Sequence, residues 1–210
     1  MKKVESTLIA AFLGIACPFS LFVIGWWTSA ALFISHLLPI PEAGIAVSAF
    51  AGLTVGVVLD IVALRRWVLR FYALDARFMV LTYLFWSVVA LAFFMGLPVG
   101  VLALGTCAGV YVGRREHHAG SDERVAAQSA RRVGLFAAAV TGTESLMMGL
   151  LAAYERFTLA WLLSLVGLKR CAGDPSVGGA VILSSCFVLT AMQYWLTRWA
   201  ALGAFRLGRK

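Results

Sequence analysis

Residues 78–113 read FMVLTYLFWSVVALAFFMGLPVGVLALGTCAGVYVG, a run of 36 positions without a single Asp, Glu, Lys or Arg. A second charge-free run of the same length spans residues 6–41. A helix needs about 20 predominantly apolar residues to cross the hydrocarbon core of a bilayer, so each run can hold at least one span. Two such runs in a chain of 210 residues predict an integral membrane protein.

The overall composition leads to the same class. Hydrophobic residues make up 61% of the chain and charged residues only 13%, with a mean hydropathy of +0.90. Soluble domains average about 45–50% apolar and about 25% charged residues. This composition excludes a soluble enzyme, a disordered chain and a small scaffold held by disulfides.

The spacing of the apolar runs predicts an all-α fold: a polytopic membrane protein whose six-transmembrane-helix bundle forms a single domain over residues 1–210. Two short apolar outer segments, 28–38 and 157–168, follow the first and fifth helices. They are either re-entrant flaps or extensions of tilted helices. Residues 114–132 form a polar cytoplasmic loop. The expected helices cover about 7–27, 43–64, 78–95, 97–113, 133–153 and 176–197.

The basic residues predict the orientation. Fifteen of the 18 lie in four clusters between apolar runs, and six spans would place all four on one side. By the positive-inside tendency, that side is the cytoplasm. We therefore expect a multi-pass protein of the cell inner membrane with cytoplasmic N- and C-termini, in contact with the lipid bilayer and not with nucleic acid. The clusters are Lys2–Lys3; Arg65, Arg66, Arg70, Arg77; Arg114, Arg115, Arg124, Arg131, Arg132; and Arg198, Arg206, Arg209, Lys210.

Glu144 is the most informative single residue. It lies 11 positions into the helix expected at 133–153, near the bilayer midplane. A carboxylate there costs at least about 2.5 kcal/mol, so it should face the bundle interior or a water-filled cavity. Thr141, Met147 and Met148 share its face by helical spacing. The pattern favours a proton- or cation-binding site or a polar anchor for substrate; the alternative is a protonated Glu that donates one interhelical hydrogen bond.

Other polar residues offer weaker candidates. Asp60 lies five residues before Arg65, which favours a structural ion pair at the inner interface. On the outer side, basic residues could attract an anion under the apolar segments, or could snorkel at the membrane surface. Cys17, Cys107 and Cys186 each fall near the middle of a span and are weak candidates for a soft-metal path. The outer candidates are His36, Glu155, Arg156 and Arg170.

The sequence lacks GxSxG, HExxH, GxGxxG and Walker patterns, which disfavours an enzyme, and it identifies no cofactor. Ridges of small residues, such as Gly52 and Gly56, predict close helix packing and could also serve a homo-oligomer. We expect a small membrane protein that binds or translocates a small solute or ion. The alternatives are a structural subunit of a larger membrane complex and an intramembrane lipid-modifying enzyme that uses Glu144 or Glu155.

In size, helix count, orientation and its small-residue first helix, the chain resembles the substrate-binding subunits of energy-coupling-factor vitamin transporters. This resemblance spans the whole chain. It implies partner ATPase subunits, because the sequence contains no nucleotide site of its own.

Overall fold

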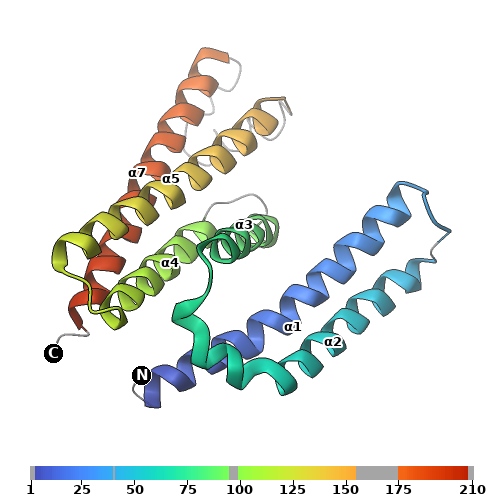
Figure 1. The fold of residues 1–210 in the computed structure, drawn as a ribbon. Coiled ribbons are helices and arrows are strands. Elements are labelled where there is room, and N and C mark those ends of the chain that lie inside the picture. Colours follow the sequence, from blue (N-terminus) through green and yellow to red (C-terminus); the bar gives the residue numbers. More distant parts are fainter. Residues whose placement is uncertain (1–2, 40, 95–98, 155–174, 208–210) are drawn as a thin grey trace. The chain divides into compact units, whose positions relative to one another are not determined.

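A computed structural model describes residues 3–39, 41–94, 99–154 and 175–207, and these ranges are helical apart from short connections. The predicted all-α, multi-pass architecture is confirmed. The elements, labelled in Figure 1 except for the short η1, are α1 (Lys3–Ile34), α2 (Glu42–Arg70), the 3-10 turn η1 (Phe71–Ala73), α3 (Ala76–Phe93), α4 (Val99–His118), α5 (Glu123–Tyr154) and α7 (Pro175–Leu207).

Five of the described helices are long and apolar enough to cross a membrane: α1, α2, α3, α5 and α7. The exception is α4, because Arg114, Arg115 and Glu116 lie in its C-terminal part. The charge-free part of α4, residues 99–113, is only about 22 Å long at 1.5 Å per residue. The sixth span therefore stays a prediction.

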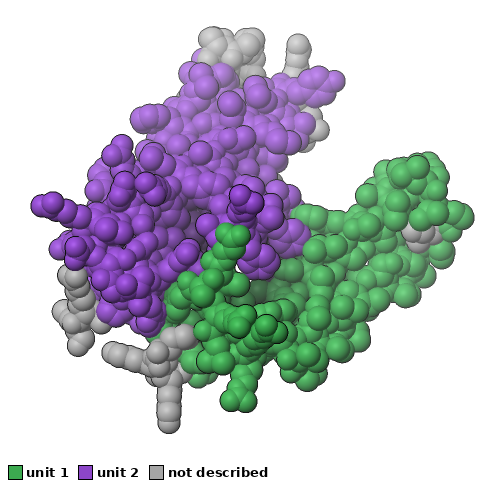
Figure 2. Space-filling view, in the orientation of Figure 1, with its two compact units in different colours: residues 1–75 green, residues 76–210 purple. Residues whose placement is uncertain are grey.

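Where the sequence predicts one domain, the chain divides into two compact units, residues 1–75 and 76–210 (Figure 2). The first unit is a hairpin of α1 and α2, whose backbones come close at glycines. A Cβ atom on Gly56 would overlap Pro18 of α1, and one on Gly52 would overlap the carbonyl oxygen of Leu21. In lipid, such close approach supplies the van der Waals contact that holds helices together.

Both helices of the hairpin run past their predicted ends. Residues 28–34 continue α1 as a helix. For these residues the helix-extension alternative is therefore correct and the re-entrant flap is wrong. The helix ends where His36 adopts a left-handed conformation, with φ of 53°, and its N–H bonds to the carbonyl of Phe33 at 3.2 Å. At the other end, the Tyr72 hydroxyl donates to Glu5 at 2.7 Å. The second predicted outer segment, 157–168, lies outside the described residues.

The second unit is built around α7, which packs on α4 and α5, while α3 packs on α4. Glycines again allow the approach: Gly109 and Gly113 of α4 meet backbone atoms of α7. On α5, Gly142 faces Thr190 and Gly149 faces Ile182, so α5 and α7 run antiparallel. Helix packing at glycines, expected for Gly52 and Gly56, thus also occurs on α4 and α5.

The prediction of a polar loop over residues 114–132 is wrong for most of its length. Helix α4 continues to His118 and α5 begins at Glu123, so only four residues connect them. The carboxylate of Glu116 accepts hydrogen bonds from Ser121 at 2.6 Å and Ser129 at 2.8 Å, which fixes the turn. The prediction ended each helix where apolar residues stop, but Arg, Glu, Ala and Gln sustain a helix equally well in water.

Replacing Gly56 with Leu should force α1 and α2 apart at Pro18 and lower the free energy of unfolding by about 1–3 kcal/mol, as for other overpacked sites. The measurement is unfolding of the purified protein in detergent. Gly179→Leu is the matched control, because a Cβ atom there meets no atom of the described residues within 4 Å. Equal losses in both variants would contradict close packing at Gly56.

Candidate functional site

Glu144 lies in the middle of the apolar part of α5, residues 133–154, and is the only charged residue there. At 1.5 Å per residue, it lies about 18 Å from Arg132 and about 15 Å from Tyr154 along the helix. Its side chain is partly buried, and its Oε2 atom is inaccessible to solvent. The expected depth of Glu144 is therefore consistent with the extent of α5.

Helix α3 supplies the nearest polar neighbours of Glu144. The fully buried Ser87 lies close enough to the Glu144 carboxyl group to interact with it. Tyr83, one turn earlier, lies close enough to interact with the charge of Glu144. The Tyr83 ring also packs on Phe136 of α5, with ring centroids 5.2 Å apart, and so joins the two helices.

Helix α5 adds Thr141, which is buried and shares a face with Glu144 by its i−3 spacing. We call Tyr83, Ser87, Thr141 and Glu144 the Glu144 cluster. Three of its oxygen atoms are buried without a hydrogen-bond partner among the described residues: Tyr83 Oη, Thr141 Oγ1 and Glu144 Oε2. Buried polar atoms are normally paired, so these atoms keep hydrogen-bonding capacity that a ligand could use.

The structure turns outward one of the two methionines that the sequence grouped with Glu144. Met147 is 68% exposed on the surface of α5, and Met148 is half-buried. Thr141 does join Glu144 in a buried position. Sequence reasoning missed Tyr83 and Ser87, whose signal was two polar side chains inside the apolar run of α3. Such side chains need partners in lipid.

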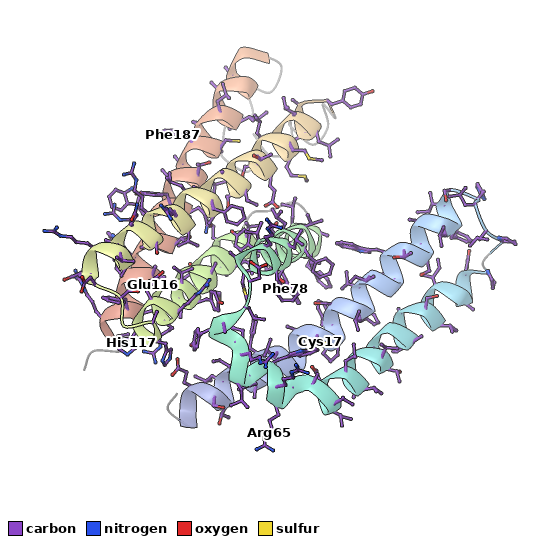
Figure 3. All side chains as sticks on the ribbon, in the orientation of Figure 1. Cys17, Arg65, Phe78, Glu116, His117 and Phe187 are labelled. Carbon is purple, nitrogen blue, oxygen red and sulfur yellow. The ribbon has the colours of Figure 1, made fainter. Side chains whose placement is uncertain are left out.

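Asp60 is a second buried acid, located in the hairpin. It is only 8% exposed, and neither carboxylate oxygen has a hydrogen-bond partner in the part of the chain that the structure describes. The expected ion pair does not form, because residues five apart lie about 140° apart around a helix. Arg65 instead extends away from the hairpin (Figure 3). The neighbour of Asp60 is Cys17 of α1, whose thiol lies 3.9 Å from the Gly56 carbonyl oxygen.

The remaining sequence candidates do not come together. Cys17 belongs to the hairpin, while Cys107 and Cys186 lie on α4 and α7, exposed and half-exposed. Within the described ranges, no group of three His, Cys, Asp or Glu side chains could hold a metal ion. His36 is exposed in the turn after α1. Outside the described residues lie Glu155, Arg156 and Arg170.

Comparison with protein-family models, with curated proteins and with solved structures finds no match for this chain. The site must therefore be interpreted from its own chemistry.

Dicyclohexylcarbodiimide, a lipid-soluble reagent for protonated carboxyl groups in apolar surroundings, should label Glu144 and Asp60 in membranes, because each carboxyl group lies within a span and has at least one oxygen shielded from water. Peptide mass spectrometry would identify the sites. Glu123, whose side chain is 56% exposed and pairs with Arg206 at 2.9 Å, is the internal control and should react far more slowly. Labelling of Glu123 as fast as that of Glu144 would contradict a buried Glu144 carboxyl group.

Proposed function

We propose that this multi-pass membrane protein binds a proton or a small hard cation at the Glu144 cluster and, through it, binds or translocates a small solute or ion. The observation that carries the proposal is the buried, unpartnered Oε2 of Glu144 at mid-span, together with the unpartnered hydroxyl oxygens of Tyr83 and Thr141. An unpaired carboxylate at this depth is costly, so a bound proton or cation would stabilise it.

The donor atoms of the cluster favour a hard ligand. All are carboxyl or hydroxyl oxygens, which suit protons and hard cations such as alkali-metal ions and Mg²⁺, whereas thiolates and thioethers suit Cu(I). Met147 faces outward and so offers no sulfur to this site. The chemistry of the cluster therefore favours proton or hard-cation binding over a soft-metal path.

Ser87 gives the site two hydrogen-bonding states. Its hydroxyl donates to the carbonyl oxygen of Leu84 at 2.9 Å, so its single hydrogen is already used. In that state, the Ser87 oxygen can only accept, which requires a protonated Glu144 as the donor. When Glu144 loses its proton, Ser87 must turn its hydrogen toward the carboxylate. Proton binding and the Ser87 rotamer are thereby coupled.

The distribution of charge supports the proposed orientation. In the second unit, Arg206 at the end of α7 pairs with Glu123 at the start of α5, so the basic segments of these helices lie at one end. With α4 as the sixth span, the positive-inside tendency would place that end in the cytoplasm of a cell with an inner membrane. Because the sequence has no nucleotide motif, active transport would need an ion gradient or a partner ATPase subunit.

Infrared difference spectroscopy on the protein in lipid would test the site directly. Raising the pH should remove the C=O stretching band of a protonated carboxyl group, and Glu144→Gln should eliminate the part of this signal that belongs to Glu144. Asp60→Asn is the matched control, since it also neutralises a buried acid but leaves the Glu144 band in place. A difference spectrum unchanged by Glu144→Gln, in variants of normal helix content, would refute the proposal.

Ser87→Ala should shift the frequency of the Glu144 band, because in the proposed protonated state the carboxyl group donates to the Ser87 oxygen, whose own hydrogen bonds to Leu84. Ser87→Thr keeps a hydroxyl group and should restore the frequency. Ser184→Ala, which removes an exposed hydroxyl group from α7, should change nothing. If the band of Ser87→Ala equals that of the native protein, Ser87 is not the partner of Glu144.

A further inference from the structure

The end of α2 carries an open groove of about 420 Å³, lined by Val62, Arg65, Arg66, Leu69 and Arg70. These five residues follow the spacing i, i+3, i+4, i+7 and i+8, which is that of a single helix face. The groove exists because α2 continues to Arg70 as a helix, past the expected end at residue 64. The continuation brings Arg70 onto the same face as Arg66.

The three arginines of the groove have no side-chain partner in the described part of the chain. All three are exposed, and neither an ion pair nor a hydrogen bond occupies their guanidinium groups. Other basic side chains differ: Arg206 pairs with Glu123, and Arg198 lies over Trp195 at 5.9 Å. Three neighbouring positive charges repel one another, and an anion among them offsets this repulsion.

The apolar members of the groove restrict what that anion can be. Val62 is 79% exposed and Leu69 is 74% exposed, and both lie among the arginines on the same face. This face lies at the C-terminal end of an apolar span, so it is located where the acyl chains of a bilayer meet the headgroups. A free anion would satisfy the arginines alone, whereas a lipid would also cover the two aliphatic side chains.

We propose that this groove is a binding site for the headgroup of an anionic phospholipid. The guanidinium groups of Arg65, Arg66 and Arg70 bind the phosphate oxygens, for which their planar, forked donors are well suited. The parts of the acyl chains next to the headgroup contact Val62 and Leu69. The site belongs to the α1–α2 hairpin alone and does not depend on the Glu144 cluster.

Native mass spectrometry of the full chain, titrated with phosphatidylglycerol in detergent, tests the site. At about 1 kcal/mol per basic residue, the triple variant Arg65→Gln, Arg66→Gln, Arg70→Gln should bind this lipid about 100-fold more weakly. The matched control is Arg124→Gln, Arg131→Gln, Arg132→Gln, which removes the same number of positive charges from another helix, α5. Its affinity should fall less than about 3-fold.

Three further measurements distinguish an anionic phospholipid from an uncharged lipid and from a free anion. Phosphatidylcholine, which has no net charge, should bind weakly to the native protein, and inorganic phosphate should not displace phosphatidylglycerol. Val62→Asn with Leu69→Asn should weaken lipid binding while leaving the arginines in place. If both triple arginine variants lose the same affinity for phosphatidylglycerol, net charge explains the binding and the proposal is overturned. If inorganic phosphate displaces phosphatidylglycerol, the groove is a simple anion site and the proposal is also overturned. Circular dichroism checks that all variants retain their helices.

Discussion

In a bilayer, apolar side chains gain little by leaving lipid for protein, so helices associate where their backbones can come close. Glycine allows this close approach here. The glycines are Gly52 and Gly56 in the hairpin and Gly105, Gly109 and Gly113 along α4. The rest of the structure depends on these contacts. They fix which face of each helix is turned inward, and thus which polar side chains are withdrawn from lipid.

The buried polar residues serve two different purposes. Gln193 of α7 donates to Thr197 at 2.9 Å against the bare backbone of Gly105, an arrangement that joins α4 and α7. The Oε1 atom of Gln193 stays buried without a partner among the described residues. The Glu144 cluster differs because its unpartnered oxygens come from two helices, α3 and α5, and include a carboxyl oxygen at mid-span. Several such oxygens around one acid suit a ligand better than a single leftover amide oxygen does.

The extent to which sequence could predict this molecule follows from the physics of each region. Inside the bilayer, charge-free runs mark helices well, and a lone Glu144 is conspicuous there. Outside it, apolarity no longer distinguishes helix from loop, so the sequence leaves two alternatives for the residues before Ile34 and misses the helical residues around Glu123. The pairing of α3 with Glu144 is harder to predict, because the polar side chains of Tyr83 and Ser87 in an otherwise apolar helix do not tell which neighbouring helix they meet.

The length of α5 has a mechanical consequence. Its 32 residues form one rod of about 48 Å, free of proline, from the charged turn at Glu123 to the far end of the span. Helix α1, by contrast, carries Pro18, which interrupts its hydrogen bonding and provides a point of bending. A torque applied to the aqueous end of α5 cannot be absorbed by a hinge along the way. A partner that bound the Glu123 end of α5 and rotated it would therefore also rotate the Glu144 carboxyl group inside the membrane.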